Sequence, residues 1–273
     1  MKIIDSHAHI FPDKIAVAAA KATMHFYETC RTPIPLTGAD LIHHNGTIGE
    51  LKEEMKKAGI EKSLVFSAAT AASQVESINS FIIRSVKDDP DFYGAGTMHV
   101  EYDKFEEECD RIKAAGLLGI KLHPDIQQFQ IDDDRLFELY EVMSDRHMFL
   151  ITHAGDNRYD YSVPTRVKRV ADNFPKLKII GAHFAGWSQW EEARQILKLD
   201  NIYMDTSSTI QYAGPQAAIK GFETFDNTHI FFGSDYPMWN PKEELQTILD
   251  LNLSDDLLEK VLHQNFEDFI ANL

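Results

Sequence analysis

The sequence predicts an α/β protein folded as a closed (β/α)8 barrel. Short apolar runs alternate with helix-prone stretches, and this strand–helix unit recurs eight times at intervals of about 30 residues. No Gly/Ser linker separates the units, so residues 1–273 are expected to form a single domain. Eight such units in about 250 residues are typical of this barrel. An open doubly wound sheet is the main alternative, but no GxGxxG motif follows the first strand.

The expected strands are short apolar runs that mostly end in polar residues. They cover residues 2–9, 63–67, 92–100, 118–123, 148–153, 178–183, 202–205 and 229–233. The expected helices cover residues 16–25, 50–58, 76–88, 105–115, 134–146, 165–174, 190–199, 215–225, 242–251 and 255–271. Gly59 and Gly116 are placed to end two of them, because glycine readily adopts the left-handed conformation found after a helix. The segment 11–60 is too long for an ordinary connection, and it is predicted to be an insertion that forms a lid or a homodimer contact.

Composition excludes several classes of function. The formal net charge of −16 disfavours binding to nucleic acid or to an anionic membrane surface, both of which attract clustered Lys and Arg. No apolar run approaches the roughly 20 residues that cross a bilayer. Cys30 and Cys109 have no CxxC-type neighbour, which favours reduced thiols in a cytoplasmic protein. The expected partner is a small-molecule substrate.

Metal-ligating residue types stand at the ends of several expected strands. His7 and His9 project to the same side of the first strand because side chains alternate along a strand. His153 ends the fifth strand and Asp235 follows the eighth. The carboxyl ends of all strands meet at one mouth of a barrel, where active sites lie. The sequence therefore predicts that these four residues hold one divalent metal ion, zinc or manganese, although each residue alone is commonly an ordinary rim residue.

Four motifs extend this interpretation to a known family. The stretches Asp5-Ser6-His7-Ala8-His9, Thr152-His153-Ala154-Gly155, Ala182-His183-Phe184-Ala185-Gly186-Trp187 and Phe232-Gly233-Ser234-Asp235-Tyr236-Pro237 resemble the amidohydrolase superfamily. They are most similar to its amidohydrolase-related branch, which includes aminocarboxymuconate-semialdehyde decarboxylase. The resemblance implies a distorted (β/α)8 TIM barrel and the same four metal ligands. It also implies that His183 is an acid/base or substrate-orienting residue and not a ligand.

The fourth strand leaves two interpretations open. Binuclear relatives carry a bridging carboxylated Lys or a Glu there, whereas this chain has Lys121 and His123 on one face. A carbamylated Lys121 could bridge two metals, but one metal is favoured, with Lys121 as a cation below the site and His123 as a rim residue that contacts substrate. The alternative is an internal Lys121 paired with a carboxylate such as Asp205. Further substrate-binding candidates follow the strands, namely Arg158, Trp187 and Trp239.

Three functions are compatible with these residues. The first is a hydrolase in which metal-activated water attacks an amide, ester or lactone carbonyl, with Asp235 accepting the proton and His183 assisting. The second is a metal-dependent non-oxidative decarboxylase of a small aromatic or unsaturated carboxylic acid. The third is a non-catalytic protein with a structural metal, which the Cys-free ligand set and the extra His183 disfavour.

Overall fold

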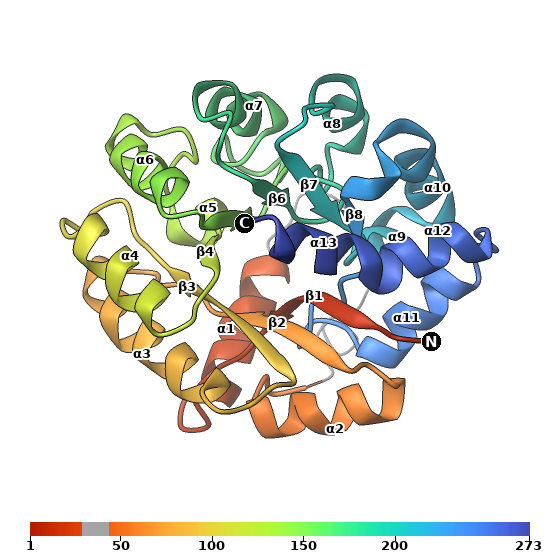
Figure 1. Ribbon diagram of the computed structural model, residues 1–273, viewed down its shortest axis with the longest axis horizontal. Helices are drawn as coiled ribbons and strands as arrows, with labels where there is room; N and C mark the ends of the chain where they lie inside the picture. Colours follow the sequence, from red (N-terminus) through yellow and green to blue (C-terminus); the bar gives the residue numbers. More distant parts are fainter. Residues whose placement is uncertain (29–43) are drawn as a thin grey trace.

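The computed structural model describes residues 1–28 and 44–273. Eight parallel strands pair in chain order, and helices surround them (Figure 1). The strands are β1 (Ile4–His9), β2 (Lys62–Phe66), β3 (Phe92–Thr97), β4 (Gly119–Leu122), β5 (Phe149–Thr152), β6 (Ile179–Gly181), β7 (Ile202–Asp205) and β8 (Ile230–Phe231). The predicted (β/α)8 barrel is confirmed.

The barrel closes between its first and last strands. Backbone N–H groups of Ser6 and His9 donate to carbonyl oxygens of Phe232 and Tyr236, at 2.9 and 2.6 Å. The N–H of Asp235 donates to the carbonyl of His7 at 2.9 Å. Residues from opposite ends of the chain are therefore neighbours, and this closure brings Asp235 to the two histidines of β1.

Helices follow the strands in the expected alternation. They are α1 (Ala16–Glu28), α2 (Ile48–Ala58), α3 (Val75–Val86), α4 (Phe105–Ala114), α5 (Pro124–Gln127), α6 (Phe137–Asp145), α7 (Pro164–Asn173), α8 (Trp190–Ile196), α9 (Thr209–Ala213), α10 (Pro215–Thr224), α11 (Pro241–Leu249), α12 (Asp255–Glu259) and α13 (Asn265–Ala271). The short helices α5 and α9 were not predicted. A π-helical turn, Lys260–Gln264, interrupts the helix predicted over 255–271. In the described part of the chain, no helix is long and apolar enough to span a membrane.

Local sequence explains where these elements begin and end. Thr47 caps α2 by accepting a hydrogen bond from the Glu50 N–H at 3.2 Å, and Gly59 ends that helix at φ 74°, as predicted. β6 is shorter than predicted because His183, Phe184 and Ala185 all have positive φ, which turns the chain out of the strand.

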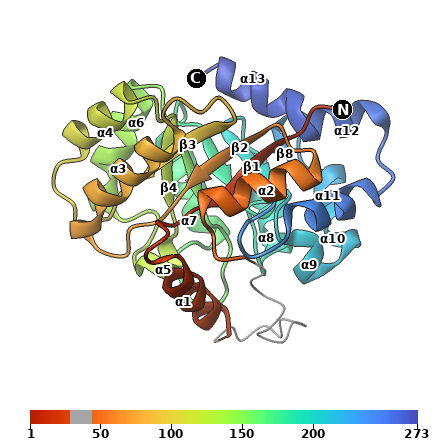
Figure 2. The same ribbon diagram turned by 90° about the horizontal axis from the view of Figure 1, so that it is seen from below.

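Different helices lie at the two ends of the barrel. One buried apolar cluster occupies the interior, and it comprises Ile4, Leu64, Phe66, Ala95, Phe149, Ile151, Ile180 and Phe231 together with Phe266 and Phe269 at the C-terminus. Helix α13 therefore plugs the amino-terminal end of the barrel, whereas α1 lies at the opposite end (Figure 2). The lid or dimer role predicted for 11–60 stays a prediction, and its Pro-rich part, including Cys30, lies outside the described residues.

Candidate metal centre

The first candidate site joins β1 to the turn after β8. His7 Nε2 and His9 Nε2 lie 3.2 Å apart, and Asp235 Oδ1 lies 3.3 Å from the first and 3.5 Å from the second. The three ligand atoms fall within 4.8 Å of one another. We call His7, His9 and Asp235 the β1–β8 cluster. Two imidazoles and one carboxylate are a donor set that suits zinc and other first-row metals.

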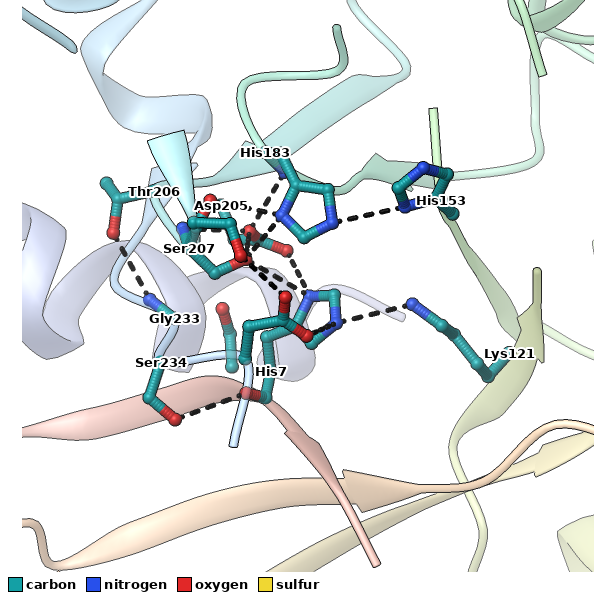
Figure 3. A network of polar contacts seen from close by, with 12 residues as sticks. His7, Lys121, His153, His183, Asp205, Thr206, Ser207, Gly233 and Ser234 are labelled. Atoms are coloured by element: carbon teal, nitrogen blue, oxygen red, sulfur yellow. Dashed lines mark hydrogen bonds and ion pairs between the residues drawn. The ribbon is translucent and has the colours of Figure 1, made fainter. Parts of the chain in front are cut away.

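His7 is held in place by a carboxylate at the end of β7. Its Nδ1 donates to Asp205 Oδ2 at 2.8 Å, which leaves Nε2 facing the cluster (Figure 3). Asp205 Oδ1 accepts from the backbone N–H groups of His183 and Ser207, both at 3.1 Å, and from the Ser207 hydroxyl. Burial would raise the pKa of Asp205, but His7 and these hydrogen bonds lower it to about 2. Asp205 is thus an ionised carboxylate that orients a candidate metal ligand, as carboxylates beside metal-binding histidines do.

The sequence interpretation missed this role of Asp205. Its position at the end of the seventh strand was a usable signal, but sequence does not show which histidine a buried carboxylate will meet.

Asp235 is oriented from its other side. Ser208 Oγ donates to Asp235 Oδ2 at 2.6 Å, and Trp239 Nε1 donates to the same hydroxyl at 2.8 Å. Burial opposes ionisation, but His7 and other nearby imidazoles hold the pKa of Asp235 well below its usual range. Its Oδ1 therefore presents negative charge to His7 and His9. Trp239, predicted to bind substrate, is buried and supports this ligand through Ser208.

His183 lies between the β1–β8 cluster and His153. Its ring stacks on His7 with centroids 5.3 Å apart, and its Nε2 lies 3.2 Å from His153 Nδ1. Its Nδ1 lies 3.0 Å from the carbonyl oxygen of Ser207, which can only accept, so Nδ1 carries the proton. Burial lowers the pKa of His183 to about 4. The imidazole is therefore neutral at pH 7 and its Nε2 is an acceptor.

The four predicted metal ligands are only partly brought together. His7, His9 and Asp235 converge, but His153 is not part of their group. It contacts His183 instead, with His183 Nε2 3.2 Å from His153 Nδ1 (Figure 3). His153 is instead grouped with Asp125 and Asp156 on the far side of its ring.

Lys121 lies beside the β1–β8 cluster. Its Nζ is 3.4 Å from His7 Nε2 and 4.7 Å from the centroid of the Phe66 ring, and the residue is 1% exposed. Burial lowers the pKa of Lys121 to about 8, although Asp235 and Asp205 act in the opposite direction. Within residues 1–28 and 44–273, no carboxylate oxygen lies within 4.0 Å of its ammonium, and Asp205 pairs with His7, so the alternative ion pair between Lys121 and Asp205 is not formed.

The remaining predicted substrate-binding residues line or support the same mouth. His123 stacks on His153 with ring centroids 4.3 Å apart. Trp187 is buried, with its ring centroid 5.7 Å from that of His153. Arg158 donates to both oxygens of Asp156, and its guanidinium lies 3.9 Å from the Phe26 ring centroid of α1. A substrate would therefore meet Arg158 as part of an ion pair and not as a lone cation.

Buried imidazole and carboxylate donors at the carboxyl-terminal mouth of a (β/α)8 barrel define a barrel protein with a candidate metal centre. The family model described as Amidohydrolase matches residues 4–269 of this chain. The chain therefore belongs to the amidohydrolase family and is an enzyme of that superfamily, as the four motifs predicted. This membership favours the two enzyme interpretations over a structural metal.

Solved structures share this fold at low sequence identity. An uncharacterized TIM-barrel protein from Bordetella bronchiseptica is 23% identical, with 99% of both chains covered and a TM-score of 0.77. A 5-carboxyvanillate decarboxylase from Sphingomonas paucimobilis is 15% identical, with 99% of both chains covered and a TM-score of 0.73. A probable 2-pyrone-4,6-dicarboxylic acid hydrolase from Acinetobacter baumannii is 12% identical, with 99% of this chain and 100% of that chain covered and a TM-score of 0.70. No curated protein matches the chain.

Proposed function

We propose that the protein is a metal-dependent hydrolase of a small molecule that carries an amide, ester or lactone carbonyl. The observation that supports this most strongly is the convergence of His7, His9 and Asp235 at the barrel mouth. A divalent metal at such a site, zinc or manganese, supplies an acidic water and polarises the carbonyl oxygen. His153 stays predicted as a fourth ligand, which would join by giving up its contact with His183.

The chain's own residues would move the proton. Asp235 is ionised and its Oδ1 faces the metal ligands, so it is placed to take the proton of the attacking water. His183 is neutral and its Nε2 faces His153 at the barrel mouth, so it can share this proton transfer or orient the substrate. The hydrogen bond that His183 donates to Ser207, and the one that Ser208 donates to Asp235, fix both side chains before the substrate arrives.

Lys121 favours a carboxylate-bearing substrate and therefore keeps the decarboxylase alternative. A buried ammonium with no carboxylate within ion-pair distance in the described chain is a ready counter-ion for an anionic group. The decarboxylase and the pyrone hydrolase that share the fold are both named for carboxylated ring substrates. We therefore propose small cyclic or aromatic carboxylic acids, and lactones or amides that carry a carboxylate, as the substrates to assay.

The test combines metal content with product analysis. Protein loaded with Zn²⁺ or Mn²⁺ is freed of excess metal, and bound metal is measured by mass spectrometry for the wild type and for His9→Asn. The loaded protein is then assayed with lactones, amides and aromatic carboxylates, following ring opening and release of carbon dioxide separately. Metal content that does not depend on His9 contradicts the proposed centre. Carbon dioxide release without hydrolysis selects the decarboxylase.

A further inference from the structure

Helix α1 is fastened to the barrel mouth at its last turn. Arg158, in the loop after β5, donates from Nη1 to the backbone carbonyl oxygen of Phe26 at 2.5 Å. Its guanidinium also lies over the Phe26 ring, with Cζ 3.9 Å from the ring centroid. A guanidinium is favourable at the C-terminal end of a helix because the last carbonyl groups have no partner within the helix. One side chain thus holds both the backbone and the ring of Phe26.

The carboxylate of Asp156 holds Arg158 in this position. Arg158 Nε lies 2.9 and 3.1 Å from the two Asp156 oxygens, and the backbone N–H of Arg158 donates to Oδ1 at 2.9 Å. Asp133 and Arg135 form a pair with the same Asp-x-Arg spacing. The Arg135 side chain is 59% exposed, whereas the Arg158 side chain is 3% exposed. The spacing alone therefore makes a surface ion pair, and the burial of Arg158 comes from the groups packed around it, which include Phe26.

The ring of Phe26 lies against a histidine of the barrel mouth. It meets the His123 ring edge-to-face, with centroids 5.9 Å apart and an interplanar angle of 90°. His123 directly follows β4, is 3% exposed, and stacks on the predicted ligand His153 with centroids 4.3 Å apart. Helix α1 lies at this end of the barrel (Figure 2). A side chain from the segment between β1 and β2 therefore contributes to the wall of the mouth, one ring away from His153.

We propose that Phe26 is a specificity-determining residue, which limits the size of the substrate group that enters the mouth beside His123. This inference rests on the proposed function, because it requires that the substrate reaches the metal centre through this mouth. Aromatic side chains on the wall of a pocket set the shape of the group that fits there. Since Arg158 binds both the ring and the backbone of Phe26, the wall is in place before a substrate arrives. Single-ring substrates are therefore favoured over substrates with fused rings.

Two esters that differ in ring size measure this limit. The metal-loaded wild type, Phe26→Ala and Phe26→Trp are assayed with phenyl acetate and 2-naphthyl acetate. In Phe26→Ala, kcat/KM for the naphthyl ester relative to the phenyl ester should rise by about 10-fold or more, because space for the second ring is opened. Phe26→Trp should lower this ratio. A rise shows that Phe26 selects by size, and it does so independently of any change in the overall rate.

Arg158→Lys tests whether the arginine holds the wall in place. A lysine ammonium can pair with Asp156 but lacks the planar fork that joins this carboxylate to the Phe26 carbonyl, so the ester ratio should move in the same direction as in Phe26→Ala. Arg135→Lys is the matched control, because Arg135 forms the same Asp-x-Arg pair at the surface. It should keep the wild-type ratio.

A second measurement needs no turnover. Diethyl pyrocarbonate modifies accessible imidazoles, and trypsin releases residues 122–135, a peptide in which His123 is the only histidine. Its modification, followed by mass spectrometry, should be faster in Phe26→Ala than in the wild type and unchanged in Arg135→Lys. Where the esters are hydrolysed, a wild-type ratio in well-folded Phe26→Ala overturns the proposal, because Phe26 then only packs against His123. If no variant hydrolyses either ester, ester hydrolysis is removed from the proposed function and the labelling decides this inference: a faster rate in Phe26→Ala retains Phe26 as the wall of the mouth, and a wild-type rate overturns it.

Discussion

The β1–β8 cluster and a second buried group, which comprises Asp125, His153 and Asp156 and which we call the β4–β5 cluster, contain the same residue types but differ in their hydrogen bonds. In the β1–β8 cluster, Asp205 orients His7 and Ser208 orients Asp235. In the β4–β5 cluster, Asp125 Oδ1 and His153 Nε2 have no hydrogen-bond partner in the described part of the chain. The first cluster is therefore fixed by surrounding hydrogen bonds, whereas the second contains two buried polar atoms that lack them.

The pKa values of the carboxyl groups also differ between the two clusters. Neighbouring imidazoles hold the pKa of Asp235 well below its usual range in spite of burial. Burial, followed by the charge of Asp156, raises the pKa of Asp125 to about 8. A buried carboxylate is thus ionised where positive neighbours compensate it and protonated where they are too few.

The largest expected effect follows from removing the charge of Asp235. Asp235→Asn keeps the size of the side chain but removes a charged ligand and the proposed proton acceptor, so kcat/KM should fall by about 10³- to 10⁴-fold. Steady-state kinetics on the metal-loaded enzyme, with metal content measured in parallel, checks this. The exposed Asp268→Asn should behave as the wild type. An unchanged rate for Asp235→Asn would remove Asp235 from the mechanism.

Substitution of His183 should reduce catalysis without reducing metal binding at the β1–β8 cluster. His183→Asn should lower kcat by about 10²- to 10³-fold, because a neutral imidazole near the reacting atoms is lost. Metal content at the β1–β8 cluster should stay at the wild-type level, unlike in His9→Asn. A variant that loses the metal together with activity would instead make His183 a ligand.

Sequence predicted the β1–β8 cluster better than the β4–β5 cluster for physical reasons. Alternation along a strand fixed the common direction of His7 and His9, and barrel closure brought Asp235 to them. Which ring nitrogen of His153 carries the proton depends on hydrogen bonds that link it through His183 to Ser207. These three residues follow three different strands. Such a chain of hydrogen bonds has no signature in sequence.

The ends of some elements and the partners of charged side chains were also not predictable from sequence. The strand–helix order was predictable throughout, but three successive positive-φ residues that end β6 were not. Arg158 was predicted to bind substrate, yet it pairs with Asp156 two positions away. A local Asp-x-Arg pair is visible in the sequence, whereas the burial that decides its partner is not.

The substitution Asp125→Asn should have an effect of intermediate size, on the unfolding free energy of the metal-free protein. The pKa of Asp125 is about 8 when folded, against the ordinary 3.8 of an aspartate in an unfolded chain, so folding at pH 7 requires a proton that the unfolded chain has released. By linkage this costs roughly 4 kcal/mol at pH 7, and the cost grows as pH rises from 4 to 8. Asp125→Asn is neutral at every pH. Its free energy of unfolding should exceed that of the wild type by up to this amount at pH 7.

Urea unfolding of metal-free protein at pH 5 and pH 7 checks this prediction. The advantage of Asp125→Asn should be larger at pH 7 than at pH 5, because more of the unfolded wild-type carboxyl is ionised at pH 7. Asp132→Asn should instead be less stable than the wild type, since it loses its pairs with Arg166 and Arg169. An advantage for Asp125→Asn that does not change with pH would contradict the link to this carboxyl.

The smallest effect comes from Asp205, and it has the opposite sign because this carboxylate is stabilised in the fold. Its folded pKa of about 2 lies below the ordinary aspartate value of 3.8, so its contribution is complete above pH 4 and is lost as pH falls through 2. Asp205→Asn should therefore cost about 2 kcal/mol of unfolding free energy at pH 6 and roughly half of that at pH 3. It should also weaken metal binding about 10- to 100-fold, because His7 loses its orienting partner. Urea unfolding and metal titration measure the two effects, with exposed Asp200→Asn as the control. If Asp205→Asn lowers stability but leaves metal affinity intact, the carboxylate supports the fold without orienting a ligand.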